Sequence, residues 1–234
     1  MRAVLIFTAS FVAAAVASGQ NIDVRGTVEM LNSKRPGAHS SDQSSAVIWL
    51  QPVDRSVEHP APGKSAIRQR NKKFDPNVLA VTAGSVVAFP NLDPFFHNVF
   101  SMYNGKRFDL GLYEAGTSRS VIFDHPGICY VFCNIHPEMS AAIVVLDTAY
   151  FAISNRSGDF RIPSVPSGRY TLEVWYQRGK PENPEAFPLQ VTIGPDHNVL
   201  APIRLIDSGE IVAPHMNKYD HPYETPAPAS GPYH

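Results

Sequence analysis

The 234-residue sequence contains little cysteine, no marked excess of either charge and, beyond its N-terminus, no long hydrophobic run. It has 2 Cys, and 20 Lys+Arg are balanced by 21 Asp+Glu, which gives a net charge of -1. A charge so close to zero provides no electrostatic surface for nucleic acid or for an anionic membrane. No internal segment reaches the roughly 20 apolar residues that a membrane-spanning helix needs. These absences exclude nucleic acid as a partner and stable membrane insertion by an internal segment.

The one apolar run begins at Ala3 and ends in small residues, Ala15 and Ala17. It is about 15 residues long, shorter than a bilayer requires, and its end has the small residues that a signal peptidase recognises. We therefore predict a signal peptide over residues 1–18 and a periplasmic or secreted mature protein that is soluble after cleavage. Because a single charge precedes the run, a retained N-terminal anchor is the alternative.

Alternation of apolar and polar residues with a period of two dominates the rest of the chain, and no segment has the pattern of a long helix. Runs rich in β-branched and aromatic residues are separated by Gly, Pro, Asn or Asp. They include residues 24–30, 46–50, 78–81, 85–89, 120–123 and 141–146. Closely spaced short strands predict an all-β fold of sandwiches or small barrels. The length exceeds one typical domain of roughly 100 to 200 residues and favours two.

The most informative segment places three metal-binding side chains close together, as Cys133-x2-His136-x2-Met139. A second imidazole, His97, lies upstream. Two His and one Cys in a plane, with a weak axial Met, form the donor set of an electron-transfer copper site. Zinc is the alternative metal, but it seldom binds a thioether. The sequence therefore predicts one copper ion with His97, Cys133, His136 and Met139 as ligands.

These motifs resemble the plastocyanin and amicyanin branch of the cupredoxins. The resemblance rests on Phe-Pro-Asn-x-Asp at 89–93, on His97-Asn98-Val99, on Pro-Gly-x4-Phe-Cys133, and on the two-residue gap between His136 and Met139. It covers about residues 66 to 146. It implies a cupredoxin-like Greek-key β-sandwich with a type 1 (blue) copper site and the four ligands above. It also implies that Asn98 ties the two ligand-bearing loops together.

The other cysteine, Cys129, lies four residues before Cys133 on the same predicted strand. At 3.3 Å per residue their Cα atoms would lie about 13 Å apart, beyond the roughly 7 Å limit for a disulfide. Cys-x3-Cys is also similar to the binuclear copper centre of respiratory oxidases, but that family has three residues before its His and this chain has two. We interpret Cys129 as a buried inert thiol next to the site, with the binuclear centre as the alternative.

No acid–base dyad, nucleophile motif or phosphate-binding loop is evident, so we expect no enzyme activity. Phe132 and Asn134 flank Cys133, whereas multicopper oxidases and copper nitrite reductases have an adjacent His that passes electrons onward. The sequence therefore favours a carrier of single electrons between periplasmic redox proteins. Ile135 keeps a backbone N–H, and we hypothesise that it hydrogen-bonds the Cys133 sulfur and raises the reduction potential.

By analogy with similar proteins, we expect the edge of His136 to reach solvent through an apolar patch. The candidate rim residues are Phe95, Phe96, Met102 and Pro137.

Residues 148–207 contain a Ser-Gly-Asp turn at 157–159, followed by Pro-x-Gly-x-Tyr-x-Leu. The pattern is similar to the carboxypeptidase regulatory-like, transthyretin-type sandwich, in which glycines supply the positive φ of the turns. That family opens with strands that resemble segments lying here before the copper motifs. We hypothesise that a copper domain, 64–147, is inserted into a discontinuous sandwich made of residues 21–58 and 148–207.

Residues 208–234 lack a periodic apolar run, and we predict a disordered tail because little surface could be buried there. It contains His215, Met216, His221 and His234. We interpret these as chance residues of a solvated tail, with weak binding and delivery of copper as the alternative. Two other functions are left open for the whole chain. One is copper delivery or storage, and the other is an extracytoplasmic binding or adhesion module with a residual metal site.

Overall fold

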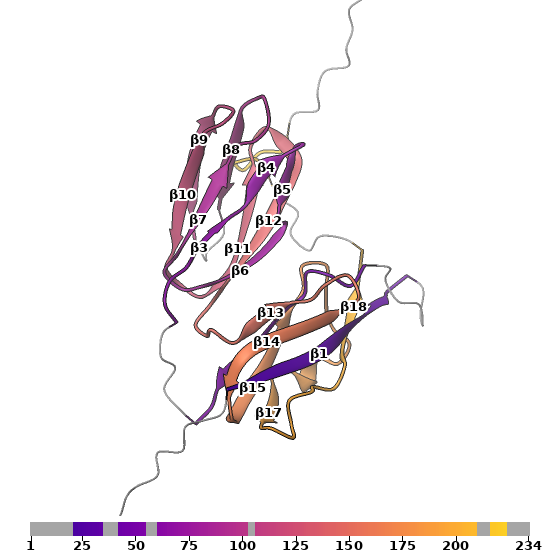
Figure 1. Ribbon diagram of the computed structural model, residues 1–234. Helices are drawn as coiled ribbons and strands as arrows, with labels where there is room; N and C mark the ends of the chain where they lie inside the picture. Colours follow the sequence, from indigo (N-terminus) through magenta and orange to yellow (C-terminus); the bar gives the residue numbers. More distant parts are fainter. Residues whose placement is uncertain (1–20, 35–41, 55–59, 103–105, 210–215, 224–234) are drawn as a thin grey trace, which may run out of the picture.

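The computed structural model describes residues 21–34, 42–54, 60–102, 106–209 and 216–223. Over these residues the chain forms two β-sandwiches, one above the other in Figure 1. The helical structure assigned within them is a single 3-10 turn, η1 (Pro184–Ala186). The predicted all-β class is confirmed. Among the described residues, no helix has the length and apolar character to cross a membrane, and the predicted signal peptide lies outside these residues.

The first sandwich comprises residues 64–102 and 106–146. Its larger sheet has the order β6 (Val78–Thr82), β12 (His136–Leu146), β11 (Gly127–Cys133), β8 (His97–Ser101) and β9 (Phe108–Tyr113). The smaller sheet has the order β10 (Ser118–Phe123), β7 (Ser85–Pro90) and β3 (Lys64–Ala66), and β4 (Arg68–Arg70) forms a hairpin with β5 (Lys73–Asp75). Alternate side chains of these strands, such as Val87, Phe89 and Val131, point inward and form one core.

The second sandwich comprises residues 21–34, 42–54 and 148–207. One sheet has the order β14 (Asp159–Pro166), β1 (Asn21–Asn32), β18 (Ile203–Asp207) and β16 (Gly179–Pro181). The other has the order β13 (Phe151–Ile153), β2 (Val47–Pro52), β15 (Gly168–Trp175) and β17 (Leu189–Ile193). The strands β1 and β2 therefore pair with strands that follow the first sandwich in sequence.

Two glycines show how closely the second sandwich packs. A Cβ atom at Gly26 would lie 2.5 Å from the ring of Phe160 on the paired strand. Gly158, in the Ser-Gly-Asp turn, has a φ of +87°, and a Cβ there would lie 2.2 Å from the Val28 carbonyl oxygen. Both distances are far below van der Waals contact, and the left-handed φ is readily adopted only by glycine. The absence of side chains at these two positions therefore allows β14 and the turn before it to pack closely against β1.

An apolar cluster joins the two sandwiches. Its buried members are Val47 of the second sandwich and Val78, Ala80, Val144 and Leu146 of the first. Both tryptophans of the chain, Trp49 and Trp175, pack against this cluster. The contact between the sandwiches thus buries apolar surface, and the two indole rings report on it.

The prediction of a disordered tail is wrong for residues 216–223. This segment lies against the first sandwich and hydrogen-bonds to it through Lys218 and Tyr223. Polar contacts to a remote loop hold it in place, and these leave no hydrophobic pattern in the sequence. His215 and His234 lie outside the described residues, whereas Met216 and His221 are exposed.

Candidate metal centre

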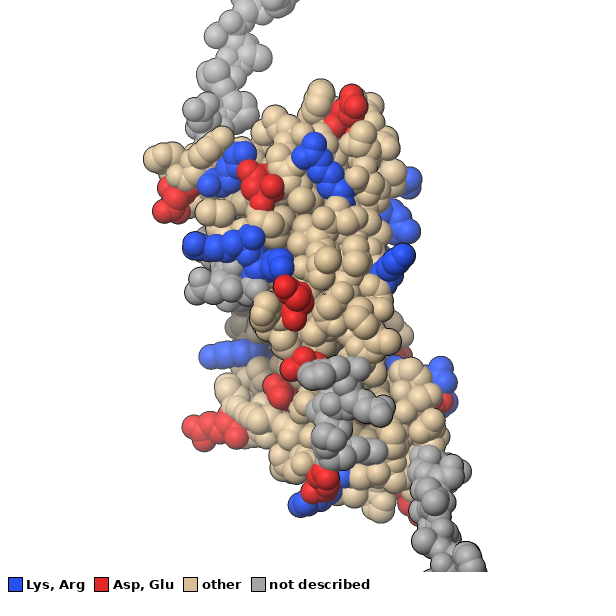
Figure 2. Space-filling view, turned by 90° about the vertical axis from the view of Figure 1, so that its left-hand side faces the viewer, with Lys and Arg blue, Asp and Glu red and all other residues tan. Residues whose placement is uncertain are grey.

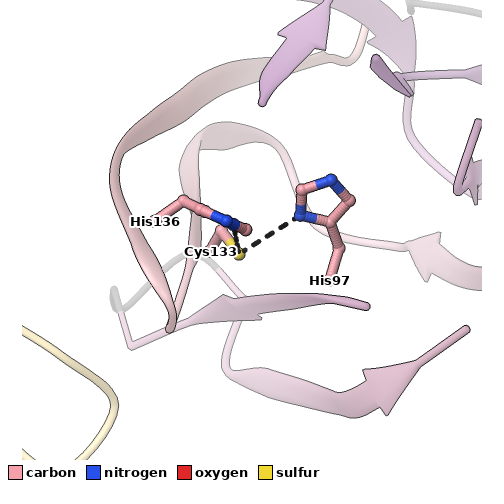
Figure 3. Close-up of side chains that lie close together, drawn as sticks. All are labelled: His97, Cys133 and His136. Atoms are coloured by element: carbon pink, nitrogen blue, oxygen red, sulfur yellow. Dashed lines mark hydrogen bonds between the residues drawn. The ribbon is translucent and has the colours of Figure 1, made fainter. Parts of the chain in front are cut away.

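Three of the predicted ligands meet at one end of the first sandwich (Figure 3). The Cys133 Sγ lies 3.8 Å from the His97 Nδ1 and 3.6 Å from the His136 Nδ1. The three donor atoms all lie within 4.8 Å of one another. Both rings present the same nitrogen to the sulfur. His97 and Cys133 are fully buried, while His136 is partly exposed.

Strand pairing explains why residues far apart in sequence meet here. β11 ends at Cys133 and β12 begins at His136, and these two residues pair across a tight turn. A register shift between Phe132 and Cys133 alters the ladder at this point, as a β-bulge does when it redirects a side chain. On the other side of β11 lies β8, whose first residue is His97. One turn therefore supplies two donors and the neighbouring strand supplies the third.

Met139 lies on β12, three residues after His136. Its side chain is fully buried and belongs to the same core cluster as Cys133. The fourth predicted ligand therefore lies in the core cluster that contains Cys133.

A buried carboxylate orients His97. The Asp93 Oδ2 lies 2.8 Å from the His97 Nε2. An ionised carboxylate only accepts hydrogen bonds, so in the neutral ring Nε2 donates and Nδ1 directs its lone pair toward Cys133. Asp93 also accepts from the backbone N–H groups of Asn71 at 2.6 Å and Lys72 at 2.9 Å.

Burial alone would raise the pKa of Asp93, but these hydrogen bonds outweigh it and the pKa lies below its usual value. The carboxylate is therefore kept ionised. The sequence motif contained Asp93, yet its role was not predicted. The signal available was an acid that lies four residues before a candidate ligand and three residues after the end of β7.

Burial also shifts the pKa values of two predicted ligands, Cys133 and His136. It raises the pKa of the Cys133 thiol, while the backbone N–H groups of Asn98, Ile135 and His136 act in the opposite direction. Burial is likewise the main reason that the pKa of His136 is lowered, and the positive charge of Lys72 adds to the effect. A lowered pKa favours the neutral imidazole, which is the form that binds a metal.

Asn98 connects three segments around the site. Its Nδ2 donates to the Asp109 Oδ1 at 2.7 Å, on β9. Its Oδ1 accepts from the backbone N–H of Asn134 at 3.3 Å, in the turn between Cys133 and His136. The side chain therefore links β8, β9 and that turn, which is the position that the resemblance implied.

Cys129 is a free, buried thiol outside the cluster. Its Sγ lies 3.4 Å from the Ser101 Oγ, and burial raises its pKa. Among the described residues, the metal-binding group contains His97, Cys133 and His136 but not Cys129.

The surface beside His136 is partly apolar. The ring of Phe95 lies 5.8 Å from that of His136 between centroids. Phe95, Phe96, Met102 and Pro137 are all exposed. Charged side chains of both signs are interspersed over the face shown in Figure 2. Of the predicted rim residues, the structure thus places Phe95 against the ligand.

Comparisons with known proteins found likeness only among solved structures. No family model and no curated protein matches the sequence. A purple cupredoxin from Nitrosopumilus maritimus is 22% identical, and the match covers 35% of this chain and 99% of that one with a TM-score of 0.33. Amicyanin from Paracoccus versutus is 18% identical, with 42% and 91% covered and a TM-score of 0.34.

A copper-containing nitrite reductase from Thermus scotoductus is 26% identical over 41% of this chain and 25% of that one, with a TM-score of 0.34. Each of these matches covers less than half of this chain, so none describes the whole molecule. The assignment of a function therefore depends on the geometry of the site.

Proposed function

We propose that this chain is an exported type 1 copper protein that carries single electrons between periplasmic redox partners. The observation that carries the proposal is the convergence of the His97 Nδ1, the His136 Nδ1 and the Cys133 Sγ within 4.8 Å. Two imidazoles and a thiolate, with the thioether of Met139 buried in the same core, suit copper in both oxidation states. Zinc fits this set less well, because it seldom accepts a thioether ligand.

When bound, copper would supply a one-electron couple. The residues around it would keep the geometry nearly unchanged between the two oxidation states. Asp93 fixes the His97 ring, Asn98 holds the turn that bears Cys133, and the core around Met139 is closed to solvent. A rigid site lowers the reorganisation that accompanies electron transfer, as a preorganised environment does in general.

The partly exposed ring of His136 supports a surface route for the electron. It reaches the surface beside the exposed ring of Phe95. The net charge of -1 gives no reason for strong electrostatic steering. We therefore propose that redox partners dock on the apolar surface next to His136. We propose no catalytic role, because Phe132 and Asn134 occupy the positions beside Cys133 where a relaying His would stand.

Copper loading followed by absorption and EPR spectroscopy tests the proposal. The wild-type protein should bind one Cu(II), absorb intensely in the visible range through the Cys133 thiolate, and give a narrow hyperfine splitting. Cys133→Ser should remove the colour. Cys129→Ser is the matched control and should keep it, because Cys129 lies outside the cluster.

Other spectra would support the alternatives. A colourless protein that retains only Cu(I) would contradict the electron carrier and favour copper delivery or storage. Loss of the signal in both cysteine variants, with a mixed-valence spectrum in the wild type, would favour the binuclear centre. Absence of specific copper binding would leave a binding or adhesion module.

A further inference from the structure

Residues 216–223, termed the strap below, lie beside the first sandwich, as the short yellow segment of Figure 1 shows. The strap has a turn of its own. The Asn217 backbone N–H donates to the His221 carbonyl at 2.9 Å, and the Asn217 Oδ1 accepts from the backbone N–H of Tyr219 at 2.9 Å. Asp220 takes a φ of +62° within this turn. The strap is thus a compact unit that presents Lys218 and Tyr223 to its neighbour.

Residues 133–136 are termed the ligand loop below. Lys218 completes a closed ring of hydrogen bonds that includes Asn134 of this loop. Its backbone N–H donates to the Asn134 Oδ1 at 2.9 Å, and its Nζ lies 2.8 Å from the Asp109 Oδ2. Asp109 and Asn134 are both bonded to Asn98. The ring therefore joins the strap, the ligand loop, β8 and β9, and Lys218 is its only member from outside the first sandwich.

Tyr223 makes a second attachment at the metal centre. Its hydroxyl donates to the backbone carbonyl of Cys133 at 2.9 Å. The strap thus bonds two successive residues of the ligand loop, one through a backbone oxygen and one through a side chain. Neither bond involves a donor atom of the candidate metal site, so the strap can hold the loop with or without metal.

We propose that the strap is a built-in latch, which holds the ligand loop closed and so limits access to the Cys133 thiol and exchange of the metal. Movement of the loop away from His97 must first break the bonds to Lys218 and Tyr223. The side chains supply two of these bonds, from the Lys218 Nζ to Asp109 and from the Tyr223 hydroxyl to Cys133. The bond to Asn134 comes instead from the backbone N–H of Lys218. Losing both side-chain bonds should raise the open population about ten- to thirty-fold. The part of the proposal that concerns metal exchange rests on the proposed function.

Thiol labelling of the metal-free, full-length protein tests the latch without relying on copper. Wild type and a Lys218→Ala/Tyr223→Phe double variant are treated with iodoacetamide, and peptide mass spectrometry follows Cys133 and Cys129 separately. We expect Cys133 to react at least about ten-fold faster in the double variant. Cys129 is an internal control, because it is buried and its thiol contacts Ser101 and Lys106, which lie outside the strap. Its rate should not change.

His221→Ala is the matched control within the strap, since the exposed His221 takes part in the turn through its backbone. It should label like wild type. Unchanged Cys133 labelling in the double variant would overturn the latch, and so would equal acceleration of both cysteines, which indicates general destabilisation. Transfer of bound copper to a chelator should then be faster in the double variant.

The labelling result and the copper spectrum separate the two proposals. A wild-type blue spectrum with unchanged labelling would leave the electron carrier intact and remove the latch. Faster Cys133 labelling in a protein that binds no copper would support the latch and contradict the proposed function.

Discussion

The two sandwiches differ in the chemistry of their buried residues. The core of the second sandwich consists of aliphatic and aromatic side chains, such as Ile48, Leu50 and Ile162. It also buries Thr148, Ser154, Gln177 and Asp207. Thr148 and Ser154 donate to the backbone carbonyls of Leu50 and Gln43, and Asp207 accepts from the guanidinium of Arg178. The first sandwich buries a series of polar side chains between residues 69 and 98. These are Gln69, Ser85, Asn91, Asp93, His97 and Asn98.

Much of this polar series is connected and leads to the metal centre. The Asn91 Oδ1 accepts from the backbone N–H of Asp93, and Asp93 bonds His97. A buried polar group costs free energy unless it is hydrogen-bonded. Replacing a buried ion pair by well-packed apolar side chains is often neutral or stabilising. The first sandwich therefore gives up apolar core at one end to fix a ligand geometry, whereas the second is built mainly for stability.

The largest effect is expected where the core is purely apolar. Leu50→Ala removes a fully buried side chain opposite Leu172, and should lower the free energy of unfolding by about 2–5 kcal/mol. Tryptophan fluorescence during denaturant unfolding measures this change. The copper spectrum below the transition should be unaffected, because the site lies in the other sandwich.

Leu189→Ala is the matched control, since Leu189 is 42% exposed on the same sheet, and it should cost much less. The copper spectrum of Leu50→Ala could instead disappear at the same denaturant concentration as the folded-state fluorescence. The two sandwiches would then unfold as one unit, and their different cores could not be assigned different roles.

A smaller effect on stability, with a marked effect on the metal, is expected for Asp93→Asn. Asn has one accepting oxygen, and its NH2 group only donates, so it cannot accept from His97 and from the backbone N–H groups of Asn71 and Lys72 together. The His97 ring is then held less firmly. We expect a loss of about 10–100-fold in copper affinity and about 1–3 kcal/mol in stability. Competition with a chelator measures the first, and denaturant unfolding the second. Equal affinity in wild type and variant would mean that the buried polar series does not serve the metal centre.

The short spacings between ligands along the chain predicted the metal site. The sequence did not predict the roles of residues that depend on polar contacts between distant segments. Cys133, His136 and Met139 lie within one turn and one strand, so their order along the chain largely determines that they meet. The role of Asp93 depends on backbone donors of Asn71 and Lys72, which come close only because β4 and β5 fold beside the site. Such contacts leave no periodic signal.

The tail shows the same difficulty. Its apolar content predicts no burial, and the strap is indeed held by hydrogen bonds and an ion pair rather than by a core. The class of the fold was predictable because alternation of apolar and polar residues is a property of each strand alone. The pairing of β1 with β14 and β18 crosses more than a hundred residues, and it could be proposed only from a resemblance.

Ile135→Pro is expected to change the reduction potential of the proposed copper site rather than the stability of the fold. The backbone N–H of Ile135 acts on the Cys133 thiol, and Ile135→Pro removes that donor. One hydrogen bond of about 1 kcal/mol corresponds to about 40 mV for one electron, so the reduction potential should fall by about that amount in voltammetry. Ile135→Ala keeps the N–H and serves as the control. An unchanged or higher potential in the proline variant would refute the role of this donor.

The smallest effect is expected for a charged pair on the surface of the second sandwich. The Arg169 Nε donates to the Asp54 Oδ2 at 2.8 Å, but the two side chains are 65% and 51% exposed. Asp54→Asn should therefore change the free energy of unfolding very little, and added salt should reduce the difference further. Asp93→Asn makes the same chemical change at a buried carboxylate, so denaturant unfolding of the two variants compares burial directly. If both cost the same, the carboxylate at the metal centre would owe nothing to its buried network, and the contrast between the two sandwiches would rest on the metal ligands alone.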